Sequence, residues 1–511
     1  MSHSIVGKIV SGIVLVVLFF ILGSEAAENA KMSLVLVAGL VGAVMMLVLG
    51  ARSWMLLFLL PPLLTVLPLP GGFREIGKPF LVAAVILPYW IFMWCMGYAK
   101  MRWRSVWVLD LLAFLSFALM IAAYIRRPVS VLALGLDTDT VGGRPYIVAA
   151  GALIYYVALS SIDLKTKKLG KVLHWHIWVA LVCGIIGALQ GLSGAGETAG
   201  EEMSMAESIA ETRFFAFSEL GSRLIVTLFA YFPLLRFLTN PLLMIGMIGA
   251  YAMIMISGFR SSFILNTIAI IFMSAAKREF LQLLLLGVAF YMGLLMLGTG
   301  GGLNILPYGV QRTLSFLPGV QVSAAAASDA QGSADWRYEM WGWALDQRTG
   351  FIRDYVWGDG VGLSKSEWMR DQRAMMRGEL RYGDQDQFAR SGQWHSLIIS
   401  TIQGLGYVGL VVMLVMIYYV SYLIIRTCFA LRGTPLFVPA MVMLMPFTPN
   451  VLFVYVNAGD LSGYFTSFII FAQAKLLFCI AREWGLIIPW SQRRRYVPLM
   501  IEQHGKQLQQ G

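Results

Sequence analysis

His395 stands where a polar stretch of the chain ends and a long apolar run begins, in the sequence QWHSLIISTIQGLGYVGLVV. An imidazole with an ordinary pKa of about 6.5 is largely neutral at pH 7, so it can accept a proton from a hydroxyl group. A histidine at the start of a helix can equally be a capping or interfacial residue. Taken alone, this position leaves both interpretations open.

Two arginines stand beside other apolar runs. Arg213 in ETRFFAFSELGS and Arg260 in ISGFRSSF each lie close to the predicted outer end of a run, where basic residues are rare in membrane proteins. A guanidinium is a rigid set of donors that matches phosphate oxygens and stays charged, so a phosphate-bearing lipid headgroup would explain both positions. The alternative is an arginine that reaches the lipid phosphates or pairs with Glu211 or Glu219.

The long polar segment before His395 carries a further basic stripe. Helical spacing puts four arginines of WMRDQRAMMRGELRYG on one face: Arg370, Arg373, Arg377 and Arg381. Such a face suits an anionic glycan or a lipid headgroup, or it is simply solvated.

A second amphipathic helix is predicted over 334–348, with Trp336, Met340 and Ala344 along one side. Its aromatic residues would stack on a sugar or dock the segment on the apolar runs, and docking is the simpler interpretation.

Membrane-spanning helices must position these residues. Of 511 residues, 58% are hydrophobic and 13% charged, whereas soluble domains carry roughly 25% charged residues. We therefore predict an all-α polytopic membrane protein with about 14 transmembrane helices. The candidate runs are 5–22, 32–50, 54–69, 79–99, 105–125, 146–162, 172–190, 222–238, 241–257, 262–276, 280–297, 396–425, 434–456 and 463–481. The first run is too long for a typical signal-peptide core, which favours a span.

The runs divide the chain into five regions. Transmembrane helices are predicted over 1–200, over 201–297 with the outer arginines, and over 396–490. A large helical periplasmic loop is predicted over 298–395, between spans 11 and 12, and a cytoplasmic basic tail over 491–511.

Basic residues set the orientation. One set of connections carries KMRWR (100–104), KTKKLGK (165–171) and RRR (493–495), while the alternate set carries the acidic stretch GETAGEEMSMAESIAE. The positive-inside rule then predicts cytoplasmic termini and an outer location for 191–221, 258–261 and 298–395. The net charge of +11 follows from this topology and from anionic lipid, without a nucleic-acid partner.

The sequence lacks the motifs of nucleotide-driven pumps and of metalloenzymes. The sequence contains no Walker loop and no HExxH motif, and its four cysteines lie in apolar runs without metal-ligand spacing, so we expect neither a metal nor a cofactor. Lys475 in IIFAQAKLLFCI is an ionisable residue inside a run. It is a functional candidate by that position, or it pairs with a nearby group.

Four segments between residues 210 and 425 resemble the O-antigen ligase and O-antigen polymerase superfamily. HSLIISTIQGLGYVGL resembles its His-led signature with a later Gly-x-x-Gly, and RYEMWGWAL…WGDGVG resembles its Arg–Trp stretch with a spaced-glycine turn. SGFRSS and RFFAFSE resemble its arginine-bearing segments. The matching residues are His395, Ser396, Gly406, Gly409, Arg337, Trp341, Gly358, Gly360, Gly362, Arg260 and Arg213. The chain departs from the family in having Ser396 where Asn is frequent, and no Asn-Pro-Asn follows Arg213.

The resemblance implies a metal-independent, inverting glycosyltransferase of the bacterial inner membrane, with a periplasmic active site. It would move a glycan from a polyprenyl (undecaprenyl) diphosphate to an acceptor hydroxyl on another glycan, a lipid A core or a protein, and we prefer the polymerase reaction to the ligase reaction. His395 would be the base, and Arg213, Arg260 and Arg337 would bind the diphosphate. The alternative is a polysaccharide flippase or exporter, which would need cations at membrane depth and usually repeat symmetry.

Overall fold

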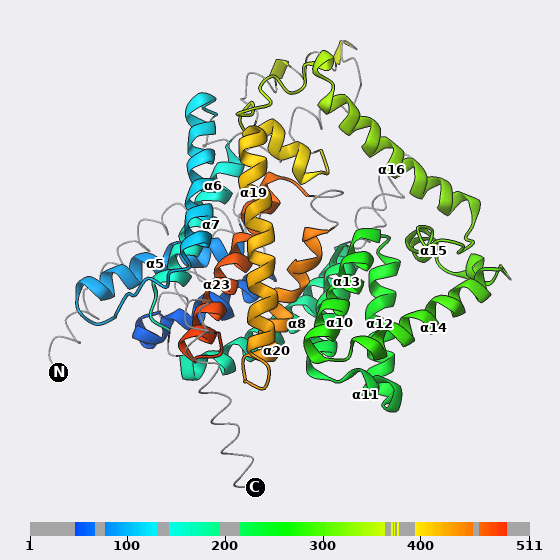
Figure 1. Ribbon diagram of the computed structural model, residues 1–511, viewed down its shortest axis with the longest axis horizontal. Helices are drawn as coiled ribbons and strands as arrows, with labels where there is room; N and C mark the ends of the chain where they lie inside the picture. Colours follow the sequence, from blue (N-terminus) through cyan, green and yellow to red (C-terminus); the bar gives the residue numbers. More distant parts are fainter. Residues whose placement is uncertain are drawn as a thin grey trace, which may run out of the picture.

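The computed structural model (Figure 1) describes residues 46–66, 77–129, 143–164, 166–194, 215–299, 301–362, 369–370, 373, 376–377, 394–452 and 459–487. All regular elements in these ranges are helices, and the extended pairing found there is an isolated bridge between Met101 and Ile162. The predicted run 5–22 and most of the run 32–50 lie outside the described residues.

The apolar runs fold as helices because a helix satisfies its backbone hydrogen bonds within the segment, as a lipid environment requires. In chain order these are η1 (Gly50–Met55), α3 (Leu56–Leu64), α5 (Lys78–Cys95), α6 (Trp107–Arg126), α7 (Arg144–Ser161), α8 (Thr166–Gly194), α10 (Phe215–Tyr231), α11 (Leu234–Thr239), α12 (Pro241–Ile256), α13 (Arg260–Lys277), α14 (Phe280–Thr299), α19 (Leu397–Ala430), α20 (Phe437–Leu444), η6 (Met445–Val451), α22 (Leu461–Thr466) and α23 (Phe468–Glu483).

Seven helical stretches of the described chain are long and apolar enough to cross a membrane. They are Met46–Leu64, Lys78–Cys95, Trp107–Arg126, Lys168–Gln190, Phe280–Thr299, Leu397–Ala430 and Leu461–Glu483. Three shorter apolar helices cover Pro145–Ser161, Pro241–Ile256 and Phe437–Val451. The all-helical class and the membrane character are therefore confirmed for the described part of the chain.

The centre of the molecule is built from α6, α7, α19 and α23. Helix α19 packs against α6 and α23, and α7 packs against α5 and α23 (Figure 1). Aromatic side chains fill this centre, with ring centroids 4.8 Å apart for Phe117 and Phe468 and 5.0 Å apart for Phe468 and Phe471. Large interlocking rings leave little freedom for these helices to slide.

A second group of helices, α10, α12 and α13, lies beside this centre. A Cβ atom on Gly221 of α10 would lie 2.6 Å from the carbonyl oxygen of Ala250, so glycine permits the close approach of α10 and α12. Helix α13 of this group begins at Arg260. The candidate residue Arg260 therefore lies at the N-terminal end of a helix in this second group.

The segment after α14 folds into η4 (Gly302–Ile305), α15 (Tyr308–Leu314), α16 (Ala324–Leu345) and η5 (Gln347–Thr349). Helix α16 confirms the helix predicted over 334–348, but it begins earlier, at Ala324, and ends earlier, at Leu345. Met340 and Ala344 are buried, and Trp336 packs against the same cluster with Trp394. The aromatic side of α16 thus docks this segment on the helices, as the simpler interpretation held.

Helix α19 bends near its start, as its first turns in Figure 1 show. Gly406 there has φ 69° and ψ −173°, outside the helical range. A Cβ atom on Gly409 would lie 2.3 Å from that of Leu405. Both glycines of the Gly-x-x-Gly pair are therefore required by the bend.

Candidate functional site

His395 lies directly before Ser396, the N-cap residue of α19. Its φ of 50° is left-handed, a conformation that a residue with a Cβ adopts only at a cost of about 1–2 kcal/mol. The preceding Trp394 is fully buried and the following Ser396 is buried at the N-cap of α19, whereas His395 itself is exposed. The strained backbone turns the imidazole out of the packed core between its two buried neighbours.

Opposite charges from two other elements act on this imidazole. Arg337 of α16 and Asp460, which precedes α22, both interact electrostatically with His395. Partial burial, followed by the Arg337 charge, lowers the pKa of His395 below its ordinary value of 6.5, and Asp460 opposes the shift. The Trp336 ring of α16 lies beside it, with centroids 6.0 Å apart. At pH 7 this surrounding keeps the imidazole neutral and able to accept a proton.

Helix α16 also receives two arginines from other helices. Arg260, at the start of α13, donates from Nη2 to the Ala330 carbonyl of α16 at 3.0 Å. The buried Arg312 of α15 forms an ion pair with Asp329 of α16, Nε to Oδ2 2.9 Å. Helices α13 and α15, which are not consecutive in the chain, therefore each place one guanidinium against the same turn of α16.

The spacing along α16 relates these two arginines to Arg337. Positions seven residues apart lie on the same helix face, about 10 Å apart along the axis. Ala330, which binds Arg260, and Arg337 are related in this way. Burial lowers the pKa of the Arg337 guanidinium, and the positive charge of Arg312 lowers it further. Arg260 and Arg312 thus contact α16 at Ala330 and Asp329, and Arg337 of the same helix acts on His395. We name the set Arg260, Arg312, Arg337 and His395 the α16 cationic row.

The structure describes some of the predicted site residues and not others. Arg260 contacts α16 at Ala330 and Arg337 of α16 acts on His395, whereas Arg213 and Arg381 lie outside the described residues. Arg370, Arg373 and Arg377 are exposed.

Two residues of the site were missed from sequence. Arg312 is one of many basic residues in a long polar segment, and no local signal separates it from the others. Asp460 accepts a hydrogen bond from the Gly463 amide at 2.6 Å as the N-cap of α22, and an Asp just before an apolar run is a recognised capping signal. The capping signal predicts where α22 begins, but it does not predict that Asp460 lies near His395.

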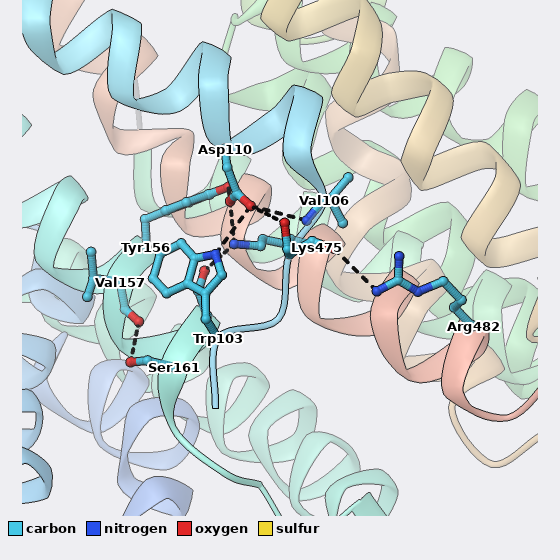
Figure 2. A network of polar contacts seen from close by, with 10 residues as sticks. Trp103, Val106, Asp110, Tyr156, Val157, Ser161, Lys475 and Arg482 are labelled. Carbon is cyan, nitrogen blue, oxygen red and sulfur yellow. Dashed lines mark hydrogen bonds and ion pairs between the residues drawn. The ribbon is translucent and has the colours of Figure 1, made fainter. Parts of the chain in front are cut away.

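Lys475 lies away from this site, in a buried polar network that Figure 2 shows. Its ammonium group donates to Asp110 of α6 at 2.5 Å and to the Ser160 hydroxyl of α7 at 2.7 Å. The Tyr156 hydroxyl donates to the same Asp110 oxygen at 2.7 Å. Lys475 therefore pairs with a nearby group, and its charge is compensated within the bundle.

No group of three or more His, Cys, Asp or Glu side chains suited to a metal ion occurs among the described residues.

A scan against protein-family models, a search of curated proteins and a search of solved structures each found no match for this chain.

Proposed function

We propose that this protein is a membrane glycosyltransferase that moves a glycan from a polyprenyl diphosphate to an acceptor hydroxyl. The proposal includes about 14 spans, cytoplasmic termini, and residues 298–395 on the periplasmic side of a bacterial inner membrane. Its acceptor is the glycan of a second lipid-linked unit, in a polymerase reaction. Transfer to a lipid A core or to a protein hydroxyl is the related reaction of the same chemistry.

The α16 cationic row is the observation that carries the proposal. It sets three guanidinium groups, from α13, α15 and α16, along α16, and one of them, Arg337, acts on the His395 imidazole. A diphosphate leaving group carries several negative charges, which fixed guanidinium groups can stabilise in a site with little water. The four sequence segments that resemble the ligase and polymerase superfamily supply three members of this row.

In the proposed reaction, the acceptor oxygen forms a bond to C1 of the glycan while the bond between C1 and the diphosphate oxygen breaks. The electron pair of that bond remains on the diphosphate, facing the arginines. The acceptor proton moves to the His395 ring, which is neutral at pH 7 because its pKa is lowered. Attack from the side opposite the leaving group inverts the anomeric centre.

The direct test uses purified protein in phospholipid vesicles with an undecaprenyl-diphosphate oligosaccharide as the single glycan. We expect release of undecaprenyl diphosphate together with a ladder of longer glycans, and loss of both in His395→Ala. His174→Gln is the matched control, because His174 contacts the Gly170 carbonyl of α8 at 2.8 Å, away from α16. This control should retain activity.

Arginine variants test the diphosphate role. We expect Arg260→Gln and Arg337→Gln to lower kcat by about 10²–10³-fold, the usual effect of removing one donor that stabilises developing charge. Arg348→Gln, an exposed arginine of the same segment, should have no effect.

The remaining outcomes separate the alternatives. Release that requires an added lipid A core would identify a ligase. Passage of the intact lipid-linked glycan across the vesicle, without release under any acceptor condition, would instead support a transporter and reject the glycosyltransferase.

A further inference from the structure

The peptide group before His395 is held from α16. The Trp341 indole Nε1 donates to the Trp394 carbonyl oxygen at 2.7 Å. That carbonyl belongs to the peptide plane whose rotation sets φ at His395. Because a left-handed φ is unfavourable for histidine, it persists only where neighbouring groups hold the peptide in place. The Trp341 hydrogen bond is one such restraint.

The Trp394 side chain supplies a second restraint. It is fully buried, and its Nε1 donates to the Gln403 side-chain oxygen Oε1 at 2.8 Å. The Phe351 ring packs edge-on against it, with centroids 5.9 Å apart. Gln403 belongs to the first segment of α19, two turns beyond His395. The indole therefore joins the residue before His395 to the region of the α19 bend.

Gln403 is in turn held by the turn of residues 357–360, with sequence WGDG. The Asp359 amide donates to the Gln403 carbonyl at 2.6 Å, and the Gly360 amide donates to the Gly404 carbonyl at 3.2 Å. On the other side of the bend, the Tyr407 amide donates to the Tyr355 carbonyl at 2.8 Å. The backbone around this turn thus satisfies groups that the break in α19 leaves without helical partners.

Two arginines at the end of α6 bind the outer side of the same turn. Arg126 donates from Nη2 to the Trp357 carbonyl at 2.7 Å and from Nη1 to the Gly358 carbonyl at 3.3 Å. Arg127 donates from Nη1 to the Asp359 carbonyl at 3.3 Å. An unbroken series of contacts therefore leads from α6 through the WGDG turn and Gln403 to Trp394 and His395.

We propose that Gln403, acting through Trp394, is the positioning residue that holds the His395 imidazole in place for proton transfer. This inference rests on the proposed glycosyltransferase function. Without the Gln403 acceptor, the buried indole loses its hydrogen bond and the Trp394–His395 peptide gains freedom to leave the left-handed conformation. A base displaced by about 1 Å can lose about 10²-fold in rate.

The test compares Gln403→Leu with Gln403→Glu in the vesicle assay. Leucine removes the acceptor at similar size, whereas glutamate retains an oxygen for the indole. We expect Gln403→Leu to lower kcat by about 10- to 100-fold with the KM for the donor unchanged, and Gln403→Glu to restore most of the rate. Gln347→Leu, an exposed glutamine of η5, is the matched control and should be fully active.

The pH profile supplies a readout that a structural role would not move. Arg337 and Asp460 are the charged groups that act on His395. If Gln403→Leu releases the ring, the acidic limb of kcat moves up toward the ordinary imidazole pKa.

Full activity in Gln403→Leu, beside an inactive His395→Ala, would overturn this inference while leaving the proposed function intact. A loss in Gln403→Leu that glutamate does not restore, with an unmoved acidic limb, would also overturn it. Absence of release by the wild type under every acceptor condition would instead reject the proposed function, and the inference with it.

Discussion

At the scale of single residues, His395 is governed by two charges of opposite sign from separate elements. Arg337 lowers the pKa of the imidazole and Asp460 raises it. Neither residue is next to His395 in the chain, so each can be changed without altering the backbone that presents the ring. The acidic limb of the activity profile should therefore respond to each charge separately.

We expect Arg337→Gln to move the acidic limb of kcat to higher pH and Asp460→Asn to move it to lower pH. Removing the cation raises the pKa of His395, so the neutral base forms at higher pH, and removing the carboxylate has the opposite effect. Asparagine retains the N-cap of α22. The measurement is kcat between pH 4.5 and about 8, a range around the ordinary imidazole pKa.

The Arg348→Gln variant serves as the control for added or lost surface charge. Limbs that move in the same direction in Arg337→Gln and Asp460→Asn would contradict this account of His395.

At the scale of elements, the bend of α19 depends on glycine at two points of contact. A Cβ atom on Gly406 would lie 2.1 Å from the Val356 carbonyl oxygen, and one on Gly358 would lie 2.4 Å from the Leu405 amide nitrogen. Both glycines have positive φ, 69° and 78°. The bend and the turn that fills it are therefore accessible only to a residue without a side chain at these positions.

Gly406→Ala should destabilise the protein by about 3 kcal/mol or more, since it combines a left-handed residue with an overlap against the backbone. The measurement is thermal unfolding in detergent micelles. Gly249→Ala in α12 is the matched control, because no atom lies within 4 Å of the Cβ position there. A Gly406→Ala variant as stable as the control would show that the bend is not restricted to glycine.

The Lys475–Asp110 pair ties α23 to α6 in the buried centre, and its surroundings satisfy both partners. Beyond Lys475 and Tyr156, Asp110 accepts hydrogen bonds from the Val106 amide at 3.1 Å and from the Ser105 hydroxyl at 3.2 Å. The Lys475 ammonium lies 4.2 Å from the centre of the Trp103 ring. A buried charge with this many partners is costly to leave alone.

We expect Lys475→Met to lower the free energy of unfolding by about 3–5 kcal/mol, because it leaves the Asp110 carboxylate buried without its cation. The double variant Lys475→Met with Asp110→Asn should recover most of this loss, since neither charge remains. Thermal unfolding in detergent micelles measures both. A double variant less stable than the single one would indicate that the pair itself supplies the stability.

At the scale of the whole molecule, basic residues in several connections bind the ends of neighbouring helices. Arg432 after α19 donates to the Ala275 carbonyl of α13 at 2.9 Å, and Lys277 donates to the Phe229 carbonyl at 2.8 Å. The Arg102 amide donates to the Ser161 carbonyl at 2.7 Å. The positive-inside rule predicts that these connections face the cytoplasm, and this orientation stays a prediction.

Cysteine labelling tests this orientation in cells. In a variant without the four native cysteines, a cysteine replacing the exposed Arg348 should react with a membrane-impermeant maleimide added from the periplasmic side. A cysteine replacing the exposed Lys100 should react only after the cytoplasmic face is opened. The reverse labelling pattern would invert the proposed topology and move the α16 cationic row to the cytoplasm.

Local patterns in the sequence predicted that the apolar runs are helical but not all of their bounds, since the run 222–238 divides into α10 and α11. Long apolar runs predict helices, because a lipid-facing backbone must satisfy its own hydrogen bonds, and the pattern at Trp336, Met340 and Ala344 predicts the docked face of α16. The family resemblance implied a turn at the glycines of WGDGVG, and Gly358, Gly360 and Gly362 all have positive φ.

Contacts between distant segments could be decided only by the tertiary structure. Lys475 and Asp110 are 365 positions apart, and no local pattern shows that packing of α6 against α23 joins them. Arg312 reaches Asp329 and Arg337 because α15 packs against α16, and Asp460 acts on His395 because α22 packs against α19. Such pairings depend on how helices cross, whereas spacing within one helix fixes only which residues share a face.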